Sequence, residues 1–293
     1  MVFNNNFCSY SNFLTFAKEW REAKPFSHIT LPNFLNKDVA NAVASEFPDL
    51  ESSDWRIYNN ALEIKKTLNH WDKFGPSTYQ VFEYLNSTSF VSGIESLVEC
   101  ELFPDFGLNG GGLHSHKRGS KSNVHLDYSI HPKLKLERRV NLLIYVTPNW
   151  KEEYGGALEL HAKHPDRDAP GELVKMIFPM FNTALLFDTS QESWHGLPEP
   201  IMCPEKITRN SLAVYYLSEP RENTTQRGKA LFYPHKDQID DPEVIELIRK
   251  RSSVIEAAKE LGIERGHLCT RYLKTGRSPR WGKFKDYQFF YAE

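Results

Sequence analysis

The first hundred residues carry hydrophobic positions at the spacing of amphipathic helices. Phe13, Phe16 and Trp20 recur three and four residues apart, which is the period of one helix face. Asn36 is a favourable N-cap for a helix that follows it. Further helical runs are predicted at 79–85 and 90–98, and an extended stretch at 25–29. We therefore predict that residues 1–100 form a helical layer that supports the rest of the chain.

From Leu102 the pattern changes to short runs of β-branched and aromatic residues between turn residues. Strands are predicted at 123–127, 140–147, 157–160, 176–178, 183–187 and 211–217. Between 102 and 217 no long helical pattern alternates with these runs, which excludes a parallel, doubly wound sheet. The pattern predicts a mainly β domain at 101–236, a sandwich or barrel with flanking helices (α+β).

The C-terminal part of the chain is predicted to be helical again. Asp240 or Asp241 caps a helix whose first residue is Pro242. Residues 249–285 hold eleven Lys/Arg and three Asp/Glu, a net charge of +8 in a chain of net charge −2. The other residues therefore carry −10. We treat residues 237–293 as a basic helical appendage joined to an acidic body.

Composition narrows the class of protein. The chain has 293 residues and is 40% hydrophobic, as is usual for globular domains. No stretch approaches the roughly 20 apolar residues of a membrane-spanning helix, and the first residues lack a secretory pattern. None of the four cysteines forms a C-x-x-C pair, and we predict that they are reduced: Cys8, Cys100, Cys203 and Cys269. We expect a cytoplasmic protein with no membrane partner.

The most informative residues are His125-Leu126-Asp127 on a predicted strand. Residues i and i+2 of a strand point to the same face, so the imidazole and the carboxylate lie side by side. His195 follows a later strand pattern at 183–187 and supplies a second imidazole. Two histidines and one carboxylate form a facial metal triad that leaves other coordination positions open, as in non-haem Fe(II) oxygenases.

A cationic partner for an organic acid is present at Arg209. It begins the predicted strand that follows His195, fourteen residues later. A guanidinium there can hold a carboxylate through two parallel hydrogen bonds.

Several motifs occur together and in order between Gly110 and Tyr216. They are Gly-Gly-Gly-Leu-His at 110–114, His125-x-Asp127, the run 139–150, Gly-Gly-Ala-Leu-Glu-Leu at 155–160, His195-Gly196, and Arg209-Asn-Ser211. In this order they resemble the Fe(II)- and 2-oxoglutarate-dependent dioxygenases, specifically the prolyl-4-hydroxylase-like branch. The resemblance implies a double-stranded β-helix (jelly-roll) core and the cofactors Fe(II), 2-oxoglutarate and O2, with ascorbate as a further candidate.

The resemblance also assigns roles to single residues. His125, Asp127 and His195 look like the iron ligands. Arg209 looks like the partner of the distal carboxylate of 2-oxoglutarate, and Tyr145 matches a tyrosine that donates its hydroxyl to the same carboxylate. Cofactor-facing positions are also expected on the same strand faces, at Asn141 and Ser211. The implied activity is hydroxylation of an unactivated C–H bond, of a prolyl residue or an amino acid, with release of succinate and CO2.

The sequence departs from the family pattern at two points. The interval between His195 and Arg209 is extended by a proline-containing loop, and a double arginine stands at Arg138-Arg139. Both put prolyl specificity in doubt. Two other classes remain open on the residues alone, namely a zinc hydrolase using the same triad and a non-catalytic barrel that binds a partner.

The basic tail suggests a third alternative. Ala258, Gly262 and Leu268 have the spacing of a helix-turn-helix, and this stretch resembles small modules attached to phage-type nucleases. Nucleic acid is therefore a candidate partner of residues 249–285. Under that hypothesis the enzyme would be a nucleic-acid-directed oxygenase (demethylase). The alternative is a helical pair packed on the barrel with its charges in solvent.

Overall fold

The computed structural model describes residues 2, 13–235, 238 and 240–251. The described helices are α2 (Ala17–Glu22), α3 (Lys37–Ser45), α4 (Pro76–Leu85), α5 (Thr88–Val98) and α6 (Pro242–Arg251). The described strands are β1 (His28–Pro32), β2 (Arg56–Asn59), β3 (Ile64–Leu68), β4 (Phe103–Pro104), β5 (Gly112–His116), β6 (Ser122–Leu126), β7 (Glu137–Tyr145), β8 (Leu158–Lys163), β9 (Pro170–Ile177), β10 (Thr183–Asp188), β11 (Trp194–Leu197), β12 (Arg209–Ser218) and β13 (Leu231–Phe232).

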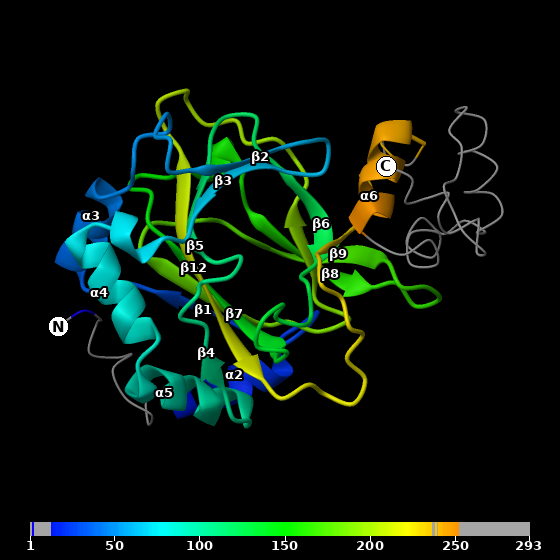
Figure 1. Cartoon of the computed structure of the whole chain (residues 1–293), viewed down its shortest axis with the longest axis horizontal. Helices are drawn as coiled ribbons and strands as arrows, with labels where there is room; N and C mark the ends of the chain where they lie inside the picture. The colour runs from blue at the N-terminus through cyan, green and yellow to red at the C-terminus, as the bar shows by residue number, and fades with distance from the viewer. Residues whose placement is uncertain (1, 3–12, 236–237, 239, 252–293) are drawn as a thin grey trace.

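Two antiparallel sheets form the core. The large sheet has the strand order β1-β10-β7-β12-β5-β3-β2, with β4 paired to β12, and the small sheet has the order β13-β6-β11-β8-β9. Figure 1 shows α3, α4 and α5 together on one side of the molecule, and α6 on the opposite side. The predicted mainly β, jelly-roll class with flanking helices is confirmed.

Alternation along the strands divides the interior into two parts. On β12, Leu212, Val214 and Tyr216 are buried in the large hydrophobic cluster that includes residues of the helices. The residues at the alternate positions of β12, among them Arg209, Ser211 and Ala213, belong to the opposite face, because successive side chains of a strand point to opposite sides. The helices therefore cover one face of the large sheet and leave the other face for a cavity between the sheets.

The first hundred residues contribute more than the predicted helical layer. The expected helices are present, and the Asn36 side chain caps α3 by accepting a hydrogen bond from Asp38 N at 2.9 Å. The same segment also supplies β1 and the β2–β3 hairpin to the two edges of the large sheet. The sequence of β3, Ile-Lys-Lys-Thr-Leu, has little alternation, so its strand conformation comes from pairing with β5.

At the C-terminal end, α6 begins at Pro242 as predicted. Asp241 rather than Asp240 caps it, because Asp241 Oδ1 accepts a hydrogen bond from Glu243 N at 2.8 Å. The predicted helix-turn-helix positions Ala258, Gly262 and Leu268 lie outside the described residues, as does most of the basic stretch. Within the part of the chain that the structure describes, no helix is both long enough and apolar enough to cross a membrane.

Candidate metal centre and adjoining pocket

The small sheet brings the three predicted metal ligands together. His125 on β6 and His195 on β11 are direct partners across the antiparallel pair, and their ring centroids are 4.6 Å apart. Asp127 follows immediately after β6, on the same side as His125. One ligand atom from each of the three residues lies within 4.8 Å of the others. The local i, i+2 spacing and the pairing of two strands are sufficient to build this triad.

Both imidazoles are oriented by the backbone. His125 Nδ1 lies 2.8 Å from the carbonyl oxygen of Asn123, and His195 Nδ1 lies 2.7 Å from that of Ser193. A carbonyl can only accept, so each Nδ1 carries the proton and each Nε2 keeps its lone pair. Those two Nε2 atoms each lie 3.9 Å from an oxygen of Asp127. Metal-binding histidines are commonly fixed in this way.

Arg138 fixes the charge on Asp127. Its Nη1 lies 3.6 Å from Asp127 Oδ1, and its guanidinium carbon lies 3.4 Å from the ring centroids of both Tyr128 and Tyr215. Burial by itself favours the protonated acid, but the Arg138 guanidinium holds the pKa of the Asp127 carboxyl below its usual range. The carboxylate is therefore ionised and ready to bind a cation.

Aromatic rings enclose the histidines. The ring of Phe232, on β13, stacks on His125 at a centroid distance of 4.8 Å and an interplanar angle of 26°. Phe187 meets His195 edge-on at 4.8 Å. Burial lowers the pKa of His125 to about 4, so this imidazole is neutral near neutral pH.

These residues fit a divalent metal ion with open coordination positions. They offer two neutral nitrogen donors and one carboxylate, which is the donor set of non-haem Fe(II) sites. Asp127 Oδ2 is buried and has no hydrogen-bond partner among the described residues. A buried, ionised oxygen of this kind is costly unless it is paired, and a bound cation would pair it.

Of the predicted cosubstrate residues, three line a cavity beside the triad, and Tyr145 is not among the residues that line it. A cavity of about 500 Å³ reaches both the triad and Arg209, with Asn141 and Ser211 also in its wall. Arg209 is 3% exposed, and its Nε donates to the Gly156 carbonyl at 2.7 Å. Its guanidinium carbon lies 4.9 Å from the ring centroid of Tyr145.

Several buried polar atoms here lack partners within the described chain. They are Arg209 Nη2, the Tyr145 hydroxyl and Asn141 Oδ1. The first two can donate to a carboxylate, which would remove the cost of leaving them unsatisfied. Burial lowers the pKa of Arg209 and raises that of Tyr145, and their mutual interaction opposes both shifts. The geometry fits a small carboxylic acid bound between the triad and Arg209.

The strand register gathers the remaining pocket residues. Ser211 lies opposite Tyr145 on β7 and opposite His114 on β5. His114, which the sequence left without a role, is buried in the cavity wall beside His116. Burial lowers the pKa of His114 to about 3. The pocket therefore contains neutral imidazoles that sequence reasoning did not assign.

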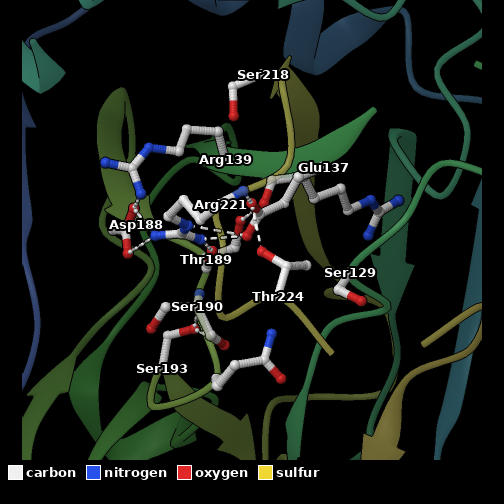
Figure 2. Close-up of polar contacts among 12 residues, drawn as sticks. Ser129, Glu137, Arg139, Asp188, Thr189, Ser190, Ser193, Ser218, Arg221 and Thr224 are labelled. Carbon is white, nitrogen blue, oxygen red and sulfur yellow. Dashed lines mark hydrogen bonds and ion pairs between the residues drawn. The ribbon is translucent and has the colours of Figure 1, made fainter. Parts of the chain in front are cut away.

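A second polar network lies at the ends of β7 and β10. Figure 2 shows Arg221 between Glu137 and Asp188, and Arg139 reaching the same Asp188 carboxylate. Arg221 Nη2 also donates to the Thr189 carbonyl at 2.5 Å. The sequence pattern marked neither Arg221 nor Phe232, because their roles depend on where a loop packs and not on local spacing.

Comparison with known proteins supports the resemblance. Residues 111–217 match the family model described as the 2OG-Fe(II) oxygenase superfamily. Prolyl 3-hydroxylase OGFOD1 of Xenopus laevis is 34% identical over 105 residues, which cover 35% of this chain and 20% of that protein. The Mus musculus protein of the same name is 29% identical over 82 residues, covering 27% of this chain and 14% of the relative. The matched segments thus span a fifth or less of these relatives.

Solved structures share the architecture. A prolyl hydroxylase from Trichoplax adhaerens, in complex with a hypoxia inducible factor oxygen degradation domain peptide fragment, aligns with a TM-score of 0.51 at 18% identity, covering 71% of this chain and 90% of that one. A Pseudomonas putida prolyl-4-hydroxylase aligns with a TM-score of 0.50 at 15% identity, covering 71% and 100%. At these identities the likeness concerns the fold. Residues 111–217 of this chain therefore match the 2OG-Fe(II) oxygenase superfamily model, and the chain shares the fold of these two prolyl hydroxylases.

Proposed function

We propose that this protein is an Fe(II)- and 2-oxoglutarate-dependent hydroxylase, with His125, Asp127 and His195 as metal ligands and Arg209 and Tyr145 as partners of the cosubstrate carboxylate. The observation that carries the proposal is that Arg209, whose buried Nη2 has no hydrogen-bond partner among the described residues, lines the same cavity as the triad. The Tyr145 ring lies against this guanidinium, and its hydroxyl also lacks a partner there. A zinc hydrolase or a non-catalytic barrel would give these two donors no function.

Each of these residues has a separate role in such a reaction. The Nδ1 hydrogen bonds of the histidines aim both Nε2 lone pairs at one point, and Arg138 keeps Asp127 ionised. Arg209 binds and orients the distal carboxylate, and Tyr145 donates a second hydrogen bond to it. When bound, Fe(II) with 2-oxoglutarate and O2 supplies an oxidant that converts a C–H bond to C–OH, releasing succinate and CO2.

A few apolar side chains border this space. Leu143 and Leu158 line the cavity, and Phe187 packs edge-on against His195. Exclusion of water strengthens every charged contact inside the cavity and protects reactive species from solvent. The protein thus contributes geometry, charge placement and desolvation.

A prolyl residue in a peptide is the substrate that we propose. The relatives named prolyl 3-hydroxylase and the prolyl-hydroxylase fold support this choice. The cavity also opens to solvent through exposed lining residues such as Arg56 and Lys229, which leaves room for a chain to extend out of the site. A free amino acid would need a more closed pocket.

Nucleic acid is not supported as a partner by the comparisons, and the residues that suggested it lie mostly outside the described part of the chain. A cytoplasmic location is also part of our proposal. It is supported by the thiols of Cys100 and Cys203, both of which are free.

The function can be tested in two steps. Anaerobic addition of Fe(II) and then 2-oxoglutarate should produce a charge-transfer absorption band in the visible range, and Arg209→Met should abolish it. Under air, succinate release should then be measured with proline-containing peptides, free amino acids and oligonucleotides. Stimulation by the peptides, with hydroxyproline in the product, supports the proposal. A folded protein that gives no band refutes it.

A further inference from the structure

The segment that follows β12, residues 219–232, runs back along the strand that carries the metal ligands. We refer to it as the return segment. Its Arg227 carbonyl accepts hydrogen bonds from Ser129 N at 2.9 Å and from Ile130 N at 3.2 Å. Further on, Leu231 pairs with Leu126, and Phe232 with His125. The return segment is therefore an antiparallel neighbour of residues 125–130, and it lies outside the part that matches the family model.

Arg227 in this segment touches both ligand-bearing regions. Its side chain is buried, with the residue 8% exposed. Its Nη2 donates to the backbone carbonyl of Asp127 at 3.1 Å, and its Nη1 donates to the Gln191 side-chain oxygen. Gln191 belongs to the turn before β11, in which the Ser193 carbonyl accepts the hydrogen bond from His195. One guanidinium thus joins the backbone of one ligand to the turn that orients another.

This link lies just beyond the end of a short strand pairing. Strands β6 and β11 are in register at His195 and His125, but the register shifts before Leu197 meets Ser122. A short, irregular ladder restrains the distance between two strands poorly. An arginine can hold two acceptors in a fixed relative position, because its donors form a rigid planar fork.

The start of the return segment is itself anchored. Figure 2 shows Arg221 and Thr224 converging on Glu137, which is 1% exposed. Arg221 Nη2 lies 2.5 Å from Glu137 Oε1, and Thr224 Oγ1 donates to Glu137 Oε2 at 2.7 Å. Arg221 also holds the Thr189 carbonyl, at the beginning of the turn that contains Gln191. The start of the return segment, which leads to Arg227, is therefore held on the large sheet.

We propose that Arg227 is a positioning residue that sets the relative placement of Asp127 and His195, and so the affinity of the triad for a divalent metal. The inference rests on the metal centre of the proposed function and adds a residue that the sequence did not single out. Arg227 acts through the Asp127 backbone and the Gln191 turn. Loss of similar outer contacts commonly weakens metal binding by about 10-fold to 100-fold.

The test measures Mn²⁺ binding to the metal-free full chain by electron paramagnetic resonance. Arg227→Met should raise the dissociation constant by about 10-fold, with the stoichiometry unchanged. Arg227→Lys, which keeps the charge but loses the fork, and Gln191→Leu should each give a smaller increase. Adding Gln191→Leu to Arg227→Met should have almost no further effect, because both remove the same link.

A matched control is available in Arg118. This arginine also donates to backbone carbonyls, those of Met202 and Cys203 at 3.1 Å each, but none of its contacts is with the triad or its turn. Arg118→Met should leave Mn²⁺ affinity unchanged. The thermal midpoint of each metal-free variant is measured in parallel. A partly unfolded variant would bind fewer Mn²⁺ ions per chain, whereas a folded variant with a weakened site would keep the stoichiometry and show a higher dissociation constant.

The possible failures are distinguishable. Wild-type affinity in Arg227→Met, or equal weakening in Arg118→Met, would overturn the positioning role. Retention of Mn²⁺ binding in His125→Ala would overturn the triad and this inference with it. If Mn²⁺ binding depends on His125 and Arg227 while the wild type forms no succinate, the hydroxylase proposal fails and the positioning role stands.

Discussion

Arg209 and Tyr145 lie side by side in the interior of the barrel with donor groups that the described residues do not use. The guanidinium carbon is 4.9 Å from the tyrosine ring centroid, and both Arg209 Nη2 and the Tyr145 hydroxyl lack partners there. A buried cation without a counterion is unfavourable in the folded protein. Burying this pair therefore costs free energy, and a bound carboxylate would offset that cost.

Arg209→Met should make the cofactor-free protein more stable and, at the same time, remove its ability to bind 2-oxoglutarate. Removing the buried charge is expected to raise the unfolding free energy of the cofactor-free protein by about 1–4 kcal/mol, since methionine fills a similar volume without a desolvation cost. The same variant should lose 2-oxoglutarate binding. Urea unfolding and calorimetric titration check the two halves. A variant that is less stable and still binds 2-oxoglutarate would contradict this account.

If Tyr145 holds the cosubstrate as we propose, Tyr145→Phe should weaken 2-oxoglutarate binding by roughly 10-fold with little change in unfolding free energy, because the hydroxyl would then bond mainly to the charged cosubstrate. Steady-state measurement of the KM for 2-oxoglutarate checks it. Tyr216→Phe is the matched control. The Tyr216 hydroxyl donates to the Leu85 carbonyl at 2.9 Å on the helix side of the sheet, so its removal should lower stability and leave the KM unchanged.

Gly196→Ala should disrupt the metal centre. A Cβ at this position would lie 2.8 Å from Val124 Cα and N, which are backbone atoms of β6. Since backbone cannot yield easily, β11 must move away from β6, at a cost of about 1–3 kcal/mol, and His195 moves with it. The affinity for Mn²⁺ should therefore fall.

Gly228→Ala is the control, because Gly228 also lines the cavity. No atom of the described residues lies within 4 Å of where the added methyl group would stand. This variant should bind Mn²⁺ like the wild type.

The stability of the metal-free protein should fall as the pH drops from about 6.5 towards about 3. Burial lowers the pKa of His114 to about 3 and also lowers that of His116. Below about pH 6.5 the unfolded chain takes up protons at these residues that the folded state excludes. Each histidine then contributes about 1.4 kcal/mol of lost stability per pH unit, and contributes nothing above about pH 7.

His114→Gln checks this prediction. It should reduce the slope of unfolding free energy against pH in urea titrations between about pH 7 and about pH 5. Identical slopes in the wild type and the variant would show that His114 is not held neutral by the fold.

The sequence predicted the triad because its geometry is mostly local. The His125-x-Asp127 spacing guarantees a shared strand face, and His195 and Arg209 could be placed from strand patterns near them. The predicted strands at 123–127, 183–187 and 211–217 correspond to β6, β10 and β12. Where the hydrophobic pattern was strong, both the type and the approximate extent of the element could be anticipated.

Features that depend on distant partners could not be predicted. β9 extends over Pro170–Ile177, whereas only 176–178 was expected, because most of its side chains are exposed and give no alternating signal. Arg138 is held by Tyr128 and Tyr215, and only the fold brings these rings to it. Arg227 and Phe232 contact the centre through a loop whose path no sequence periodicity encodes.

The strands at the two edges of the large sheet limit how this domain can be divided. Residues 111–217 match the family model, yet β1 covers β10 at one edge and β3 with β2 covers β5 at the other. A fragment that began at residue 101 would present two unprotected strand edges to solvent and to other copies of itself. A fragment that keeps both edges of the large sheet covered must therefore begin before His28, so the sheet does not form from residues 111–217 alone.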